Sequence, residues 1–186
     1  MREIRTIAVI GAGAEGRNIA GKTILGGFRT ILEDILPASL RRAQGEIRDS
    51  LNAAVHAGDI GEADAEAALT RLVFATSLED AAREADMVIE AVPDEFDSKE
   101  EIFRLLDRIC RPGTLLVASS HSLRVTDIAA ITERPADIVG MRFRHSDCVG
   151  GSIEVISGSS TSVETLQAAL MAARRMRLDV VQLSET

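Results

Sequence analysis

A glycine-rich segment near the start of the chain most constrains what it can fold into. Residues 7–10 (IAVI) are apolar, residues 11–16 (GAGAEG) follow at once, and the next stretch can form a helix. In this setting Gly11 permits a tight turn from a strand to a helix, Gly13 lets the backbone approach a pyrophosphate, and Gly16 lets the helix lie close to the strand. A glycine turn without a ligand is the alternative, because the G-x-G-x-x-G pattern alone is weak.

The glycine-rich segment predicts a phosphate site at the start of a helix. Unpaired backbone amides and the positive end of the helix dipole attract an anion there. A carboxylate at the same helix end competes electrostatically with the pyrophosphate, so Glu15 is expected to weaken binding. The residues expected to lie against the pyrophosphate of a dinucleotide are Gly11, Gly13, Ala14, Glu15 and Gly16.

An acidic residue follows at the spacing that a dinucleotide site needs. About 20 residues beyond the glycines, such sites place a carboxylate at the end of the second strand, where it accepts hydrogen bonds from the adenosine ribose hydroxyls. Residues 29–34 (RTILED) supply two candidates, and we choose Asp34 over Glu33. A carboxylate here would repel a ribose 2'-phosphate, so the sequence predicts NAD rather than NADP. The alternative is a solvated acidic residue in a loop.

Composition limits the class of protein. The chain has 186 residues, of which 46% are hydrophobic, enough for one domain with a sizeable core. Its net charge of -8 disfavours nucleic acid or an anionic membrane surface as the main partner. The chain lacks a run of about 18 apolar residues and a signal-peptide pattern, so we expect a cytoplasmic location. Cys110 and Cys148 lack the spacing of metal ligands and are expected to be reduced thiols, with Cys110 on the buried face of a helix.

Strand patterns alternate with helix patterns along the chain. Apolar runs predict strands at 7–10, 29–34, 86–92, 114–118, 137–141, 153–156 and 179–183. Helical spacing predicts helices at 37–58, 63–72, 102–109 and 162–176. This alternation indicates an α/β fold of the Rossmann type, with a doubly wound, mostly parallel sheet and helices on both faces. The two helices after the second strand form an inserted helical pair.

The order of these segments resembles one protein family. The motifs that carry the resemblance are 10–13 (IGAG), 90–94 (EAVPD), Lys99, 117–123 (VASSHSL), 140–146 (GMRFRHS) and 153–156 (IEVI). On these residues the chain resembles the NAD-binding N-terminal domain of 3-hydroxyacyl-CoA dehydrogenases over nearly its whole length. The resemblance implies that four further residues lie against the cofactor, namely Ala91, Asp94, Lys99 and Ser119.

The resemblance also implies a reaction, hydride transfer between C3 of a 3-hydroxyacyl-CoA and NAD. In the family a histidine takes the hydroxyl proton, a glutamate orients that histidine, and a serine and an asparagine hydrogen-bond the reacting oxygen. The glutamate is kept as Glu154, whereas Arg142 stands in place of the histidine. His121 replaces the serine and His145 replaces the asparagine. A guanidinium, with a pKa above about 12, cannot act as a base near neutral pH.

Three explanations of this remodelled site stay open. In the first, His121 or His145 acts as the base, with Glu154 orienting it and Arg142 polarising the carbonyl or binding an anionic group. In the second, the domain binds NAD without catalysis, and Arg142 simply pairs with Glu154. In the third, the domain belongs to a dehydrogenase that acts on a different hydroxy or keto substrate.

The end of the chain is a further departure from the family. Members continue after the last predicted strand into a helical domain that provides dimer contacts and closes over the acyl-CoA, whereas this sequence ends at residue 186. We therefore expect one domain, residues 1–186, without the helical C-terminal domain of the family. The resemblance implies a small-molecule substrate, an acyl-CoA, and a place in fatty acid metabolism, and it leaves a homo-oligomer open.

Overall fold

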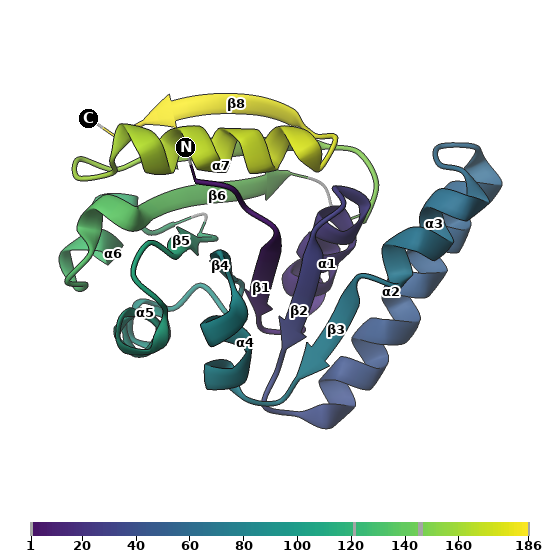
Figure 1. The fold of residues 1–186 in the computed structure, drawn as a ribbon, viewed down its shortest axis with the longest axis horizontal. Coiled ribbons are helices and arrows are strands. Elements are labelled where there is room, and N and C mark those ends of the chain that lie inside the picture. The colour runs from purple at the N-terminus through teal and green to yellow at the C-terminus, as the bar shows by residue number, and fades with distance from the viewer. Residues whose placement is uncertain (1, 121, 145–146, 186) are drawn as a thin grey trace.

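The computed structural model describes residues 2–120, 122–144 and 147–185, and these form one sheet of eight strands (Figure 1). The strands are β1 (Thr6–Ile10), β2 (Arg29–Glu33), β3 (Leu72–Ala75), β4 (Met87–Glu90), β5 (Leu115–Ala118), β6 (Ile138–Arg144), β7 (Ser152–Ser157) and β8 (Asp179–Ser184). Their order across the sheet is β3-β2-β1-β4-β5-β6-β7-β8. The β6–β7 pair is antiparallel and the other neighbouring pairs are parallel. The predicted mostly parallel sheet is confirmed.

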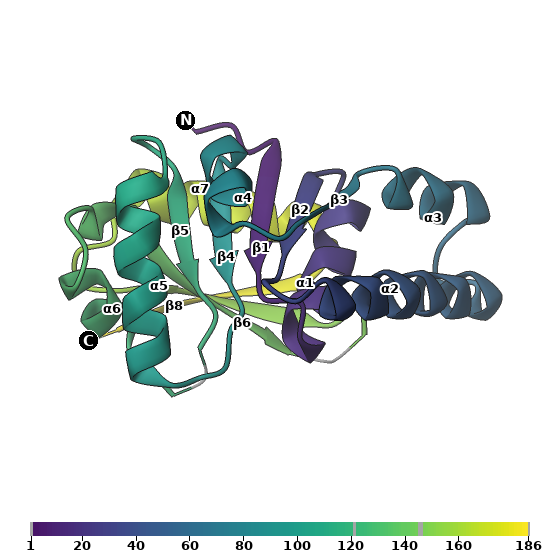
Figure 2. The ribbon, with the colours of Figure 1, turned by 90° about the horizontal axis from the view of Figure 1, so that it is seen from below.

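Helices cover both faces of this sheet. They are α1 (Ala14–Leu25), α2 (Pro37–Ala57), α3 (Glu62–Leu69), α4 (Leu78–Glu84), α5 (Phe96–Ile109), α6 (Val125–Ala130) and α7 (Val163–Arg175), with a short 3-10 helix at Pro135–Asp137. Helices α1 and α7 lie on one face, with α2 and α3 packed beside α1, and α4, α5 and α6 cover the other face (Figure 2). The predicted doubly wound fold and its inserted helical pair, α2 and α3, are thus confirmed.

Strand β1 lies at the centre of the fold because both of its faces are apolar. Ile7 and Val9 pack into the core under α1 and α7, whereas Ala8 and Ile10 pack into the core under α4 and α5. From β1 the chain builds β2 and β3 on one side and then returns to build β4, β5 and β6 on the other. Such a change of direction leaves a crevice at the carboxyl ends of the strands, where ligands of open α/β sheets bind.

The start, the end and the buried face of helix α2 follow from the residues of its own sequence. Pro37 is its first residue, where the missing N–H is not needed, and Gly58 ends it in the left-handed conformation at φ 81°. The predicted apolar stripe faces the core, with Leu40, Ala43, Ile47 and Leu51 buried and Val55 half-buried.

Three short elements were not predicted from the sequence. The predicted helix at 63–72 ends at Leu69, and Leu72 instead begins β3, an edge strand that no glycine or proline separates from the helix before it. Helices α4 and α6 have seven and six residues, too few to show a helical period. Ser77 caps α4 by accepting a hydrogen bond from the Asp80 amide at 3.3 Å.

The structure also bears on the predictions for the cysteines and for membrane-spanning segments. Cys110 is buried but follows directly after α5, so its predicted place within the helix is wrong by one residue. Both thiols are free, and burial raises the pKa of Cys110 to about 11. Across the described residues, the helices are too short or too polar for any to cross a membrane.

Candidate functional site

The glycine loop joins β1 to α1 at the crevice and has the geometry of a phosphate cradle. Gly11 adopts φ +98°, a conformation that side chains rarely adopt. A Cβ on Gly16 would lie 1.8 Å from the Gly11 carbonyl oxygen, so the helix approaches the turn as closely as only glycine permits. A Cβ on Gly13 would meet nothing within 4 Å, and Gly13 and Ala14 are exposed. The backbone at Gly13 is therefore open to a ligand at the start of α1.

Asp34 follows β2 directly and lies beside this loop. Its Oδ2 accepts a hydrogen bond from the Ala12 amide at 3.0 Å, and its Oδ1 accepts one from the Leu36 amide at 2.9 Å. The Gly11 amide donates to the Glu33 carbonyl at 2.8 Å, which joins the two strand ends. A half-buried carboxylate fixed against a glycine loop fits the two adjacent hydroxyls of a ribose whose phosphate sits on that loop.

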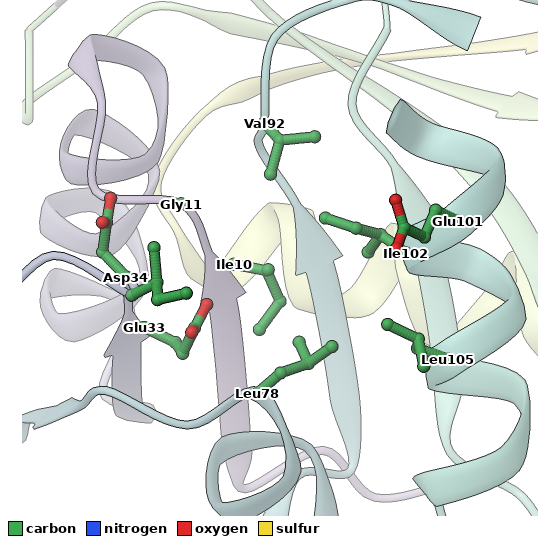
Figure 3. Close-up of a pocket in the computed structure, with 10 residues that line it drawn as sticks. Ile10, Gly11, Glu33, Asp34, Leu78, Val92, Glu101, Ile102 and Leu105 are labelled. Carbon is green, nitrogen blue, oxygen red and sulfur yellow. The ribbon is translucent and has the colours of Figure 1, made fainter. Parts of the chain in front are cut away.

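A mostly apolar cavity of about 290 Å³ opens next to Asp34 (Figure 3). It lies between the ends of β1 and β2, the start of α4 and one side of α5. The residues that line it are Ile10, Gly11, Glu33, Asp34, Ile35, Leu78, Val92, Glu101, Ile102 and Leu105. Gly11 and Asp34 line both this cavity and the phosphate cradle, so the two form one continuous surface.

Lys99 forms a buried ion pair with Glu90 behind the crevice. Both side chains are 0% exposed, and the Lys99 ammonium donates to the two Glu90 carboxylate oxygens at 2.9 and 2.7 Å and to the Ser119 carbonyl at 2.9 Å. Burial raises the pKa of Glu90, and the charge of Lys99 opposes that rise. In this structure Lys99 therefore ties β4 to the segment after β5 rather than presenting its charge to the crevice.

The other residues implied by the resemblance surround that segment. Ala91 packs against the glycine loop, and its carbonyl oxygen would lie 2.9 Å from a Cβ on Gly11. The Ser119 hydroxyl donates a hydrogen bond to the Glu15 carboxylate, which is thereby held at the crevice. The sequence reasoning did not foresee this contact, because it joins the first helix to a segment 104 residues away.

Asp94 holds the turn after β5 in place. It accepts hydrogen bonds from the Ser120 hydroxyl at 2.6 Å, the Ser122 hydroxyl at 2.8 Å and the Ser122 amide at 3.1 Å. Burial alone would raise the pKa of Asp94, but these hydrogen bonds outweigh it and hold the pKa below its usual value. Asp94 is therefore charged at neutral pH and orders the polar segment that borders the crevice.

The antiparallel strands β6 and β7 bring Arg142 and Glu154 together. The two residues are register partners, with 3.7 Å between Arg142 Nη1 and Glu154 Oε2, and Arg142 Nε donates to the Ser120 carbonyl at 2.8 Å. Arg144 lies two residues further along the same strand and donates to Glu154 Oε1 at 2.8 Å. His121 and His145, the two predicted replacements for the family's serine and asparagine, lie outside the described residues.

Two residues that the sequence reasoning missed stand out here. Arg144 lies on the same strand face as Arg142, and the two-residue period of a strand could have revealed it. Lys22 is 1% exposed on α1 and donates to the carbonyls of Asp147 and Gly150, so it holds the loop between β6 and β7. Burial lowers the pKa of Lys22. A lysine in the last turn of a helix gives no sign in the sequence of partners so far along the chain.

Comparisons with known proteins agree with this geometry. The model of the 3-hydroxyacyl-CoA dehydrogenase NAD-binding domain matches residues 6–186. A probable 3-hydroxybutyryl-CoA dehydrogenase of Bacillus subtilis is 34% identical over 98% of this chain and 63% of that protein. The 3-hydroxyadipyl-CoA dehydrogenase of Escherichia coli is 34% identical over 90% of this chain and 35% of that protein.

A solved structure extends the comparison to the whole fold. The crystal structure of (S)-3-hydroxybutyryl-CoA dehydrogenase from Ralstonia eutropha superposes with a TM-score of 0.93 at 28% identity, covering 99% of this chain and 65% of that one. The chain thus spans less than two thirds of each of these relatives. The glycine loop, the acidic residue after β2 and the sheet order all match an NAD-binding domain, and the chain belongs to the 3-hydroxyacyl-CoA dehydrogenase family as that domain.

Proposed function

We propose that this chain is the cofactor-binding part of an NAD-dependent oxidoreductase that transfers hydride between a 3-hydroxyacyl-CoA and NAD. The observation that carries the proposal is the cradle at the crevice, where the loop open at Gly13 meets a carboxylate, Asp34, fixed to the Ala12 amide. The names of the Bacillus subtilis and Escherichia coli relatives support an acyl-CoA as the substrate and fatty acid metabolism as the setting.

The residues of the chain divide the work of binding. The amides at the start of α1, around Gly13 and Ala14, take the pyrophosphate, and Asp34 accepts hydrogen bonds from the adenosine ribose. NAD, when bound, supplies the hydride acceptor or donor. Ser119 and Asp94 order the segment after β5 at the edge of the crevice, and Lys99 holds that segment from behind.

A second candidate function is an NAD-binding domain without catalysis. The favouring observation is that Glu154, which orients the base in the family, is occupied here by Arg144 at 2.8 Å and lies 3.7 Å from Arg142. The Glu154 carboxylate is thus already paired with arginine side chains, which compete with a histidine for its oxygens. For Glu154 to orient a histidine as in the family, its ion pair with Arg144, whose side chain is half exposed, would have to open.

Turnover of a family substrate distinguishes the two functions. The full chain is mixed with acetoacetyl-CoA at NADH concentrations that saturate binding, and the loss of NADH is followed by absorbance. The oxidoreductase proposal expects steady consumption, and it expects either His121→Ala or His145→Ala to abolish turnover while NADH affinity stays nearly unchanged. Saturated binding with no consumption would contradict hydride transfer by this chain on its own and would favour either the silent domain or a domain that needs the helical domain of the family.

Three further proposals concern the location of the protein and its partners. We place it in the cytoplasm, a proposal supported by two free, buried thiols in the described residues. A homo-oligomer and the absence of a nucleic-acid partner are also proposed, the latter supported by the net charge of -8.

A further inference from the structure

The cavity beside Asp34 contains a second carboxyl group, to which the cofactor contacts described above assign no role. Glu33 is the last residue of β2, is 7% exposed, and points into the cavity between Ile10 and Leu78 (Figure 3). No hydrogen bond or ion pair from the described residues reaches this carboxyl. The carboxyl therefore faces the open cavity rather than the closed core, and a ligand that fills the cavity and displaces water from it must supply a hydrogen-bond partner in return.

The charged groups that face Glu33 are all acidic. Of the residues that line the cavity, Asp34 follows Glu33 in the chain and Glu101 comes from α5. The other elements packed around the cavity contribute apolar side chains, such as Ile10 from β1, Leu78 from α4 and Val92 after β4. With no cation among these lining residues, the cavity disfavours a phosphate and favours an uncharged group that donates hydrogen bonds.

The position of the cavity identifies that group. Gly11 and Asp34 line both the cavity and the cradle, so a dinucleotide with its phosphate on the loop and its ribose on Asp34 places the adjoining nucleobase in the cavity. The volume of about 290 Å³ is near the lower end for small-molecule sites, roughly 300 Å³, and suits one planar ring system. Ile102 and Leu105 on α5 supply an apolar wall opposite Leu78.

We propose that Glu33 recognises the adenine base of the cofactor in its protonated form, so that nucleotide binding takes up one proton from solvent. This inference rests on the proposed NAD-binding function and deepens it. Adenine offers an amino donor beside a ring-nitrogen acceptor. A protonated carboxyl offers one donor and one acceptor and matches that edge, whereas a carboxylate can only accept.

Burial prepares Glu33 for this role. Burial, with a smaller contribution from the charge of Asp34, raises the pKa of Glu33 to about 7 in the ligand-free chain. A nucleobase that covers the cavity removes more water from the carboxyl, which disfavours the charged form further. Affinity is therefore expected to be highest below the ligand-free pKa and to decrease as the pH rises above it, because a smaller fraction of the protein is then protonated at Glu33.

Calorimetric titration of the full chain with NADH tests this coupling. Titrations near pH 7 in two buffers of different ionisation enthalpy give the number of protons taken up, and about half a proton per NADH is expected when the ligand-free pKa is about 7. The Kd for NADH is expected to rise about tenfold between about pH 6 and about pH 8. NADH suits the test because its pyrophosphate does not titrate in this range.

Two substitutions assign the proton to Glu33. Glu33→Gln keeps the shape and stays neutral, so it is expected to bind NADH at all these pH values as tightly as the unmodified chain does near pH 6, with no proton uptake. Glu101→Gln, the matched control on the exposed rim of the same cavity, is expected to keep the proton uptake of the unmodified chain.

Each result has one meaning. Loss of the pH dependence in Glu33→Gln and its retention in Glu101→Gln would support the proposal. Proton uptake that persists in Glu33→Gln, or NADH binding by the unmodified chain without proton uptake, would overturn it while leaving the NAD-binding function intact. Failure of both the unmodified chain and Glu33→Gln to bind NADH at any pH would overturn the NAD-binding function itself, and the inference with it.

Discussion

Replacement of Lys99 by methionine is expected to destabilise the fold strongly. The side chains of Lys99 and Glu90 are 0% exposed, and the substitution removes the ammonium that contacts both Glu90 oxygens and the Ser119 carbonyl. Glu90 keeps one hydrogen bond, from the Val92 amide at 2.8 Å, and otherwise remains a buried charge without a counter-charge. Breaking such a pair costs about 3 to 5 kcal/mol in free energy of unfolding.

Urea unfolding of three variants measures this cost. Lys99→Met is compared with the unmodified chain, and Arg104→Met is the matched control because it breaks an exposed ion pair on the same helix, with Glu100. The control is expected to change the free energy of unfolding by about 0.5 kcal/mol or less. Adding Glu90→Gln to Lys99→Met removes the unpaired charge and should recover part of the loss, at least about 1 kcal/mol.

The pH dependence gives a second check on the same pair. Burial raises the pKa of Glu90 in the folded protein, and removing Lys99 raises it further, so the folded variant binds more protons than its unfolded chain. The stability of Lys99→Met should therefore fall as the pH rises through the unfolded and then the folded pKa of Glu90. A loss below about 1 kcal/mol at neutral pH, or no recovery on adding Glu90→Gln, would refute the buried-charge reasoning.

Three other substitutions test the crevice. Gly16→Ala places a Cβ 1.8 Å from the Gly11 carbonyl, so we expect a lower Tm and lost NADH binding; unchanged binding would show that α1 can move away. Asp34→Ala should narrow the preference for NADH over NADPH in fluorescence titrations, and an unaltered ratio would contradict the ribose role. Glu33→Gln should stabilise the ligand-free chain by up to about 3 kcal/mol as the pH rises from 4.5 to about 7, since the folded pKa is raised. If the Tm of Glu33→Gln differs from that of the unmodified chain by the same amount at pH 4.5 and at about pH 7, the pKa of Glu33 is not raised.

Features set by local chemistry could be predicted from the sequence. The glycine loop was predictable because Gly11 and Gly16 satisfy steric requirements of one strand-to-helix turn. Asp34 was predictable because its distance from the loop follows from the length of one helix and one strand. Long apolar stripes, such as the one along α2, also carry their own period.

Features that depend on distant partners could not be predicted. Lys22 contacts Asp147, 125 residues later in the chain, and Ser119 contacts Glu15 from 104 residues away, so neither contact has a local pattern. The buried pairing of Lys99 with Glu90 also has no local pattern, and the expected contact of Lys99 with the cofactor stays a prediction. The short elements β3, α4 and α6 were missed because they are too short to show a period. Helices α4 and α6 have seven and six residues, less than two helical turns, and β3 has only four residues in which apolar and polar side chains could alternate.

At the remodelled catalytic position, one partner of Glu154 was expected from the sequence and the other was not. One of the three explanations drawn from the sequence pairs Arg142 with Glu154, and the antiparallel register of β6 and β7 makes these residues neighbours. The stronger partner of Glu154 is Arg144, which a search for the family's catalytic residues does not consider. Physical pairing on one strand face, rather than similarity to a motif, identifies it.

A fluorescence titration of the full chain with NADH tests the central claim most directly, because the glycine loop, Asp34 and the cavity together describe one NAD site. We predict saturable binding of NADH, with weaker binding of NADPH because Asp34 repels a 2'-phosphate. The absence of saturable NADH binding by the folded chain, or equal affinity for NADPH, would contradict the account.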